Sequence, residues 1–171
     1  LSLTLWLNVD ELFDKLVSLG QFPRELSDTM TVLEKIGHFL DMENQRLFSK
    51  YKSIGLPNNE ITPLIEQNVD VADILRNSAE DFDGGYAIAG MFGHGDAFVL
   101  RDPNGIRPAY YYKDDEVVVV ASERPAIQTS FNVHRSKVQE IQPGHALIIH
   151  KDGSVGEVMC RKPLERKACS F

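Results

Sequence analysis

The sequence predicts an α+β fold in which helices pack on antiparallel sheets. Apolar residues recur at helical spacing as far as Phe82, and from Tyr86 onward short β-rich runs alternate with Gly, Asn and Asp turns. Helices that come first and strands that follow favour separate layers, because a parallel sheet would need strands and helices in alternation.

The first two helices are expected over Val9 to Leu19 and from about Asp28 to Asp41. In the first, apolar residues stand at i, i+3, i+4, i+7 and i+8, and Gly20 supplies a stop. The second carries its apolar residues on one face, and Ser27 precedes it as a candidate N-cap. Both segments are amphipathic, so each is expected to bury one face.

The next stretch of the chain is interrupted by prolines. Residues 44–66 contain Pro57 and Pro63, which break any long helix, so no element is assigned there. A third helix is expected over Val69 to Phe82, and the pair Gly84-Gly85 ends it. The first half of the chain is thus predicted to hold three helices.

Short strands and tight turns make up the second half. The strands are expected at Tyr86–Phe92, Ala97–Arg101, Ala109–Tyr112, Val117–Ala121, Lys137–Ile141, His145–His150 and Val155–Met159. His94 falls in the first of these turns and is expected to face solvent. One more helix is expected to begin at Ser122-Glu123-Arg124-Pro125, with Ser122 as its cap.

Composition excludes several classes of protein. The 171 residues are 43% apolar and 25% charged, as in ordinary globular domains, which excludes a disordered, collagen-like or coiled-coil chain. The formal charge of −7 argues against general binding to nucleic acid or to an anionic membrane. Neither is expected as a partner.

The cysteine content suits a reducing compartment. Cys160 and Cys169 are too few for a disulfide framework, so a cytoplasmic location is expected. The apolar start, Leu1 to Leu7, is too short for a membrane span and lacks the basic flank of a signal peptide. The histidines and cysteines lack zinc-like spacing, and no metal site is expected within the chain.

The most distinctive stretch runs from Arg101 to Pro108. Its centre, Asp102-Pro103-Asn104-Gly105, has Asp, Pro and Gly where a type I turn prefers them. A hairpin turn explains this centre but not the two arginines, Arg101 and Arg107, that flank it. Their guanidinium groups could fork onto carboxylates or onto backbone carbonyls that shape a pocket, and the spacing leaves both open.

Four motifs, in their order and spacing, resemble the glutaminase domain of the amidophosphoribosyltransferase family. They are Gly84-Gly85-Tyr86-Ala87, Arg101 to Pro108, Val120-Ala121-Ser122-Glu123 and Gln142-Pro143-Gly144-His145-Ala146. The eight-residue turn is the most specific, and Cys169-Ser170-Phe171 resembles the linker that follows the domain. Asparagine synthetases have a looser form of the turn, and the run Tyr110-Tyr111-Tyr112 is similar to theirs.

The resemblance implies an N-terminal-nucleophile (Ntn) hydrolase fold, an αββα sandwich, which this chain is expected to hold incompletely at its N-terminus. Full-length members hydrolyse glutamine and transfer the ammonia to phosphoribosyl pyrophosphate, which gives 5-phosphoribosylamine in purine synthesis. The implied partners are glutamine, phosphoribosyl pyrophosphate on a second domain, and further copies in a homo-oligomer. The implied cofactors of the full-length enzyme are Mg²⁺ and, in cluster-bearing members, a 4Fe-4S cluster to which Cys169 would contribute. None is expected in this chain alone.

The same resemblance implies one substrate contact and its support. Ser27-Asp28-Thr29 matches the element that opens the second helix in the family, where the Asp receives the α-ammonium group of glutamine. Ser27 and Thr29 then serve as caps or hydrogen-bond supports. Without the resemblance, Asp28 would simply complement the helix dipole. Residues expected to shape or support the glutamine pocket are Arg101, Asp102, Asn104, Gly105 and Arg107.

The family's catalytic nucleophile is an amino-terminal cysteine, activated by its own α-amino group. Leu1 is not cysteine, and Cys160 and Cys169 lie near the far end, so the nucleophile is expected upstream of this chain. The Asn-Gly pair that forms the family's oxyanion hole would fall near Leu3 and Thr4, which are unsuited to that role. No catalytic residue is assigned, and the chain alone is expected to be inactive.

Three segments are expected along the chain. Residues 1–7 are an atypical start or a stretch foreign to the natural protein, and residues 8–160 are the C-terminal portion of the glutaminase domain. Residues 161–171 begin a linker to a phosphoribosyltransferase domain. Two alternatives stay open: a non-catalytic domain of the same fold that binds an amino acid or a protein, and the glutaminase part of an asparagine-synthetase-like enzyme.

Overall fold

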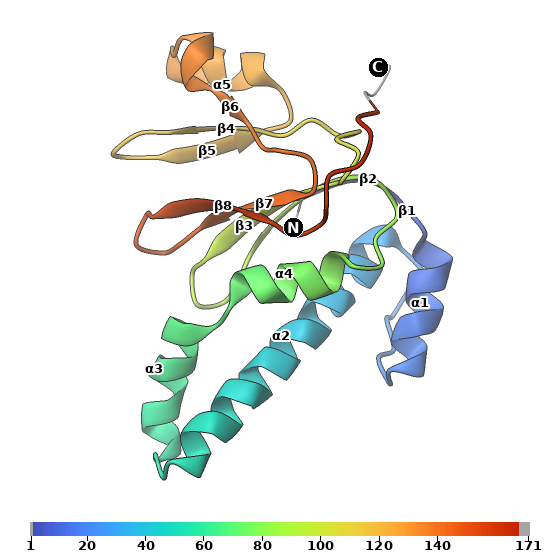
Figure 1. The fold of residues 1–171 in the computed structure, drawn as a ribbon, viewed down its shortest axis with the longest axis vertical. Coiled ribbons are helices and arrows are strands. Elements are labelled where there is room, and N and C mark those ends of the chain that lie inside the picture. The colour runs from blue at the N-terminus through green and yellow to red at the C-terminus, as the bar shows by residue number, and fades with distance from the viewer. Residues whose placement is uncertain (1, 168–171) are drawn as a thin grey trace. The chain divides into compact units, whose positions relative to one another are not determined.

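The computed structural model describes residues 2–167 and divides the chain into two compact units. We call Val9–Phe82 the helical unit, and the residues up to Asn8 and from Asp83 onward the strand unit. Figure 1 labels α1 to α4 in the helical unit and the strands of the strand unit. No helix within the described range is both long enough and apolar enough to cross a membrane.

The helical unit begins with α1, which covers Val9–Ser18. Leu12 and Leu16 are buried on its apolar face. Gly20 follows at φ +81°, a left-handed conformation that a residue without a side chain adopts with little strain. The first predicted helix is confirmed to within one residue.

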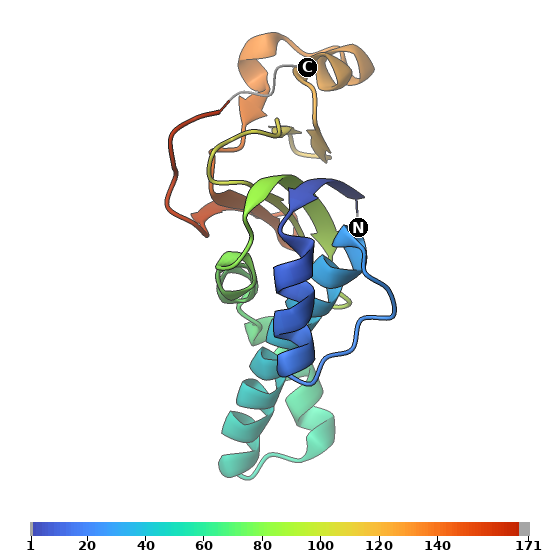
Figure 2. The same cartoon turned by 90° about the vertical axis from the view of Figure 1, so that its right-hand side faces the viewer.

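The longest helix of the described chain is α2, which covers Asp28–Ser53. Its predicted start is confirmed, because the hydroxyl of Ser27 accepts a hydrogen bond from the backbone N–H of Met30 at 3.4 Å. α2 runs alongside α1, α3 and α4 and contacts all three (Figure 2). The helical unit is therefore organised around this one helix.

The predicted end of α2 near Asp41 is wrong. Residues 42–53 contain neither Gly nor Pro, so nothing stops the helix there. The buried face continues through Leu47 and Tyr51, and the turn ends only at Gly55, with φ +88°.

A helix that the sequence did not predict, α3, covers Asn58–Asn68. It begins directly after Pro57 and contains Pro63, whose ring removes one backbone donor from the helix. The buried side chain of Ile61 packs with Leu47 of α2 and offsets this loss. Tertiary packing thus outweighs the local signal of the two prolines.

The last helix of this unit, α4, covers Val71–Ala79, a shorter stretch than the predicted Val69 to Phe82. The carboxylate of Asp70 accepts the backbone N–H of Asp73 at 2.9 Å and caps the helix. That cap sets the start of α4 at Val71.

The described part of the strand unit holds two antiparallel sheets, with strand orders β1-β2-β3-β7-β8 and β5-β4-β6. The bounds are β1 Ser2–Leu7, β2 Gly84–Met91, β3 Ala97–Arg101, β4 Tyr110–Lys113, β5 Val118–Ala121, β6 Gln139–Glu140, β7 His145–Ile149 and β8 Val155–Met159. All seven predicted strands are present. Helices together with antiparallel sheets confirm the predicted α+β class.

The two sheets stack on a small apolar core within the strand unit (Figure 1). Val99 of β3 and Leu147 of β7 come from the larger sheet. Ala109, just before β4, and Ile141, just after β6, come from the smaller one. All four are buried, so the sheets share one core.

A further helix, α5, covers Arg124–Phe131 and packs on the smaller sheet through the buried Ile127. The predicted cap, Ser122, is wrong. The N-cap residue is Glu123, whose side chain makes no capping hydrogen bond. A short 3-10 helix follows at Arg135–Lys137.

The helical unit is inserted between β1 and β2. These two strands pair antiparallel, with Leu7 opposite Gly84 at their inner end. The backbone N–H of Asn8 donates to the carbonyl oxygen of Asp83 at 3.2 Å, and the N–H of Asp83 donates to the side-chain oxygen of Asn8 at 3.1 Å. The chain thus leaves and re-enters the strand unit at neighbouring points.

Candidate functional site

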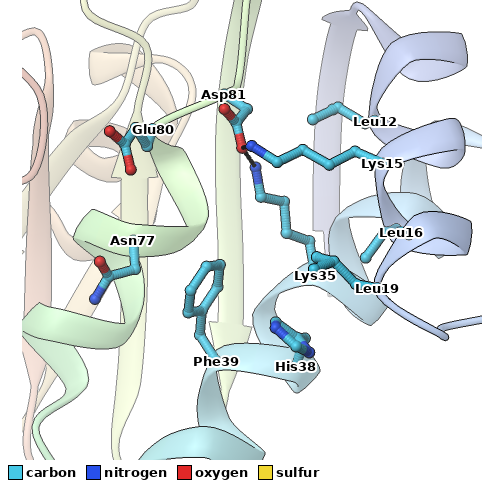
Figure 3. A pocket seen from close by; sticks show the side chains of 10 residues that line it. All are labelled: Leu12, Lys15, Leu16, Leu19, Lys35, His38, Phe39, Asn77, Glu80 and Asp81. Atoms are coloured by element: carbon cyan, nitrogen blue, oxygen red, sulfur yellow. Dashed lines mark hydrogen bonds and ion pairs between the residues drawn. The ribbon is translucent and has the colours of Figure 1, made fainter.

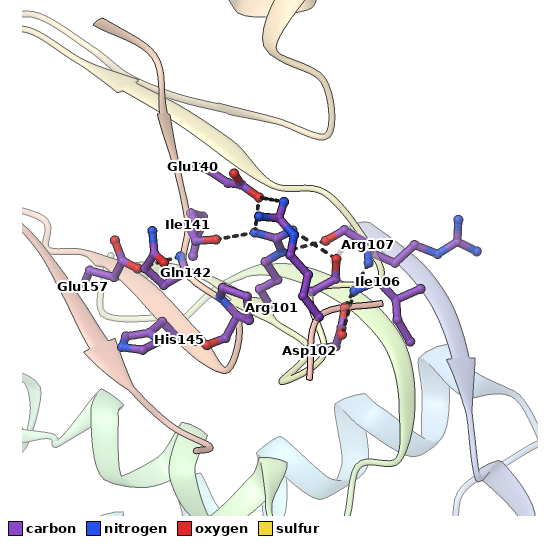
Figure 4. Close-up of polar contacts among 12 residues, drawn as sticks. Arg101, Asp102, Ile106, Arg107, Glu140, Ile141, Gln142, His145 and Glu157 are labelled. Atoms are coloured by element: carbon purple, nitrogen blue, oxygen red, sulfur yellow. Dashed lines mark hydrogen bonds and ion pairs between the residues drawn. The ribbon is translucent and has the colours of Figure 1, made fainter. Parts of the chain in front are cut away.

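Arg101 ends β3 and is only 1% exposed, yet its guanidinium is well supplied with acceptors. Its Nε donates to the carbonyl oxygen of Arg107 at 2.7 Å, and its Nη2 to that of Gly105 at 3.2 Å. Its Nη1 donates to the carbonyl oxygen of Ile141 and, at 2.8 Å, to the carboxylate of Glu140 (Figure 4). Arg101 therefore holds backbone carbonyls and a carboxylate together.

Asp102 is fully buried, and its side chain and backbone both form hydrogen bonds that stabilise the turn. Its carboxylate accepts the backbone N–H groups of Ile106 at 2.9 Å and Arg107 at 3.0 Å. Its carbonyl oxygen accepts the N–H groups of Gly105 and Gly144, at 3.1 and 3.0 Å. Because every one of these bonds involves backbone, the conformation of the turn is fixed.

Arg107, the second arginine of the turn, differs from Arg101 in its surroundings. Its side chain is half-buried and extends away from Arg101 (Figure 4). Within residues 2–167 its guanidinium makes no hydrogen bond or ion pair. The backbone of Arg107 is thus part of the turn, whereas its guanidinium is not.

The structure brings three of the four sequence motifs together at this turn. The N–H of Asp102 donates to the carbonyl oxygen of Tyr86 at 2.9 Å. A Cβ on Gly105, at φ +64°, would lie 2.9 Å from Cγ of Pro143. A Cβ on Gly85 would lie 2.8 Å from Cγ2 of Ile106. Close approach therefore favours glycine at positions 85 and 105.

The segment after β8 runs along the turn. The backbone N–H of Leu164 donates to the carbonyl oxygen of Pro103 at 2.8 Å, and that of Lys167 to Asn104 at 2.9 Å. The side-chain amide of Asn104 donates to the carbonyl oxygen of Glu165 at 2.9 Å. We call residues 160–167 the strap, because these bonds tie it to the turn.

Two further contacts anchor the strap. Arg166 Nη2 lies 2.8 Å from the same Glu140 oxygen that Arg101 binds. The N–H of Arg161 donates to the carbonyl oxygen of Gly144 at 2.8 Å. A Cβ on Gly144, at φ +72°, would lie 2.3 Å from the carbonyl oxygen of Arg161, so only glycine fits there.

The predicted substrate-binding residue, Asp28, is the first residue of α2 in the helical unit. It is half-buried, and its carboxylate has no protein partner in the described part of the chain. Ser27 is the N-cap, and Thr29 is exposed. One turn further on, Thr31 is fully buried with its hydroxyl unpaired by any residue from 2 to 167. Thr31 was not predicted as a buried polar residue, because nothing in the sequence distinguishes a threonine beside Val32 from one that faces solvent.

A second polar cluster, also missed, lies inside the helical unit. Lys35 Nζ is 2.5 Å and Lys15 Nζ 2.6 Å from the same Oδ2 of Asp81 (Figure 3). Burial lowers the pKa of Lys35, and its bond to Asp81 opposes that shift. Burial also raises the pKa of Asp81, but the hydrogen bonds from the two lysines outweigh it and hold that pKa below its ordinary value. The adjoining cavity of about 60 Å³ has room for water but not for an amino acid.

The expected exposure of His94 is wrong. Its side chain is 9% exposed and stacks on Phe92, with ring centroids 5.7 Å apart. Its Nε2 lies 3.4 Å, and His150 Nδ1 2.7 Å, from the same Oδ2 of the buried Asp96. The carboxylate joins the β2–β3 turn to the β7–β8 turn and draws His94 inward.

The residues present do not fit either cofactor that the resemblance implies. Within residues 2–167 no group of three or more His, Cys, Asp or Glu could hold a metal ion. A 4Fe-4S cluster takes four ligands, usually thiolates, and the whole chain has two cysteines. Cys160 is half-buried and forms no disulfide within the described part of the chain, and Cys169 lies outside the described residues.

Comparison with known proteins agrees with this geometry. Residues 59–129 match the model of a glutamine amidotransferase domain. The amidophosphoribosyltransferase of Pasteurella multocida is 34% identical over 107 residues, which cover 60% of this chain and 20% of that protein. The Saccharomyces cerevisiae enzyme of the same name is 34% identical over 96 residues, which cover 53% of this chain and 18% of that protein. The chain thus spans about a fifth of the length of these relatives.

Solved structures share the fold. Glutamine phosphoribosylpyrophosphate amidotransferase from B. subtilis, complexed with ADP and GMP, matches with a TM-score of 0.63 and 25% identity over 95% of this chain and 29% of that one. A structure described as the allosteric regulatory enzyme of purine biosynthesis matches with a TM-score of 0.64 and 24% identity, over 95% of this chain and 28% of that one.

The matched residues and the fold are similar to those of glutamine amidotransferase domains. More narrowly, the chain matches part of the glutaminase region of the amidophosphoribosyltransferases, the family that its motifs predicted. The turn that Arg101 holds lies within the matched region.

Proposed function

We propose that this chain is part of an enzyme that releases ammonia from glutamine and transfers it to phosphoribosyl pyrophosphate, giving 5-phosphoribosylamine for purine synthesis. The observation that carries the proposal is the assembly of three family motifs around the buried Arg101, within a chain whose relatives bear that enzyme's name. A domain outside these 171 residues would bind phosphoribosyl pyrophosphate with Mg²⁺. Further copies of the chain would form a homo-oligomer in the cytoplasm.

Within this enzyme, Asp28 would bind the α-ammonium group of glutamine. Its carboxylate is half-buried, has no protein partner in the described chain, and sits at a helix start fixed by Ser27. An N⁺–H donor and a carboxylate form a short bond about twice as strong as a neutral one. Partial burial strengthens the attraction further, because less water screens it.

Glutamine binding by the chain and its Asp28→Asn variant tests this role. Titration calorimetry should show weaker binding by about tenfold, since one charge-assisted hydrogen bond is lost. Asp41→Asn is the matched control, because Asp41 is exposed on the same helix. If Asp28→Asn alters helix stability by about 0.3–1 kcal/mol and leaves glutamine binding unchanged, Asp28 serves only the helix dipole.

We infer further that these 171 residues alone do not hydrolyse glutamine. An N-terminal nucleophile must be the first residue, whereas the two cysteines stand at positions 160 and 169. Ammonia release from glutamine should stay at the level of a buffer blank. Release at an enzymatic rate would contradict this inference and leave the glutamine-binding role untouched.

One observation favours a second candidate, a domain that binds an amino acid without hydrolysing it. Leu3 and Thr4 of β1 stand where the family's Asn-Gly oxyanion pair is expected, and neither supplies that pair. An amidotransferase fused to a cysteine-bearing native segment should release ammonia, and a binding domain should bind glutamine without turnover. The two measurements on one full-length protein separate the candidates.

A further inference from the structure

We propose that a hollow beside α5 binds the phosphate group of a small molecule. The hollow lies in the strand unit and has a volume of about 560 Å³. Among the residues that line it are Tyr110, Ser122, Arg124, Gln128 and Arg135. This volume is within the range of small-molecule pockets, and no lining residue belongs to the helical unit, which contains Asp28.

Arg124 is the main observation. Its guanidinium lies over the ring of Tyr110, with the carbon Cζ 4.8 Å from the ring centroid. Its Nε is shielded from solvent and has no hydrogen-bond partner among residues 2–167. No other nitrogen of this guanidinium has a hydrogen bond or ion pair within the described chain either, so its terminal nitrogens can donate to a bound anion. Stacking on the ring fixes the orientation in which the group would meet its ligand.

The rest of the lining suits an anion with several acceptor oxygens. Arg135, from the short 3-10 helix, adds a second guanidinium. The hydroxyls of Tyr110 and Ser122 and the amide of Gln128 add neutral donors. Glu123 is the one carboxylate in the lining, so the hollow is locally cationic in a chain of net charge −7.

A phosphate group fits these donors better than a carboxylate does. Two guanidinium groups and three neutral donors surround the hollow, and phosphate offers three or more oxygens where a carboxylate offers two. The start of α5 adds a favourable dipole, because no side chain caps it. The proposal does not depend on glutamine hydrolysis, since no residue of the Arg101 network takes part in it.

Nitrogen-15 NMR of the chain tests the proposal, because the Nε–H resonance of Arg124 reports directly on the site. Titration with inorganic phosphate should shift this resonance in a saturable way at millimolar concentration. AMP should shift it as well, and a lower dissociation constant for AMP than for phosphate would show that the nucleoside adds contacts. Glutarate, a dicarboxylate, should bind at least about tenfold more weakly than phosphate.

Variants make the test independent of the spectrum. Arg135 is exposed, so Arg135→Gln should keep the fold and weaken phosphate binding by about tenfold. Arg124→Gln should do the same, and Arg24→Gln, an exposed arginine of the helical unit, is the matched control. The proposal is overturned if phosphate leaves the Arg124 resonance unmoved, if glutarate binds as tightly, or if Arg24→Gln weakens binding as much as Arg135→Gln.

Discussion

Arg101 Nε donates to the carbonyl oxygen of Arg107 at 2.7 Å, so one arginine of the turn holds the backbone of the other. The two residues therefore divide their roles. The guanidinium of Arg101 is buried and pairs with Glu140, whereas that of Arg107 extends away unpaired within residues 2–167. Arg101 fixes the shape of the turn, and the guanidinium of Arg107 takes no part in it.

Replacing Arg101 should unfold the turn, whereas replacing Arg107 should not. Arg101→Met leaves three buried carbonyl oxygens without their donor and Glu140 with Arg166 alone, and we expect a loss of about 3–5 kcal/mol in the free energy of unfolding. Arg107→Met is the matched control and should change it by about 0.5 kcal/mol or less. Urea denaturation of both variants gives the comparison. Equal losses would contradict the division of roles.

The strap should depend on the absence of a side chain at Gly144. A Cβ there would meet the carbonyl oxygen of Arg161 at 2.3 Å, whereas Gly153, at φ +83°, has no atom within 4 Å of the same position. Both Gly→Ala changes add the strain of a left-handed residue, about 1 kcal/mol. Gly144→Ala should cost at least about 2 kcal/mol more, because the backbone of Arg161 must move. Limited proteolysis should then cut residues 160–167 faster in Gly144→Ala alone.

The stability that Asp81 supplies should depend on pH. Asp81→Asn leaves the ammonium group of Lys35, whose side chain is 5% exposed, without its carboxylate, so we expect a loss of about 2 kcal/mol at pH 7. The folded-state pKa of Asp81 is below the ordinary 3.8, so its contribution is complete above that value and disappears as the pH falls through the lower folded-state pKa. Unfolding curves of the wild type and the variant should therefore converge only in strong acid. Asp14→Asn, on the exposed side of α1, is the matched control and should change the free energy of unfolding at pH 7 by about 0.5 kcal/mol or less.

Thr31→Val should stabilise the chain. The buried hydroxyl has no partner among the described residues, and valine has nearly the same shape without the polar atom. We expect a gain of about 1 kcal/mol, measured by thermal or urea unfolding. Thr29→Val, at an exposed position on the same helix, should change little. A loss of stability in Thr31→Val would show that the hydroxyl has a partner, such as a buried water.

Local signals predicted the ends of helices where a cap or a left-handed glycine marks them. Ser27 and Gly20 mark the start of α2 and the end of α1 through hydrogen bonds or dihedral angles confined to neighbouring residues. The last turns of α2 pack against α3. The sequence did not predict α3, because Pro63 lies inside that helix. Burial from a distant segment outweighs such a local signal.

The candidate site, like the fold, could be predicted only where its contacts are local in sequence. The sequence identified the turn from Arg101 to Pro108, but it left the partners of Arg101 open because Ile141 and Glu140 lie some forty residues further on. His94 was expected in solvent for a similar reason. Its neighbours Asp96 and His150 meet only when the two hairpins fold side by side. Contacts between segments far apart in the chain carry no periodicity that a single sequence reveals.

The bonds between Asn8 and Asp83 make the whole helical unit the connecting loop of a single β-hairpin. Pairing β1 with β2 therefore closes a loop of every residue from Val9 to Phe82, and the entropy lost on closure is smaller once those residues are already compact. The order of folding follows from this. The helices should form before β1 joins the sheet, and damage to their core should release the edge strand first.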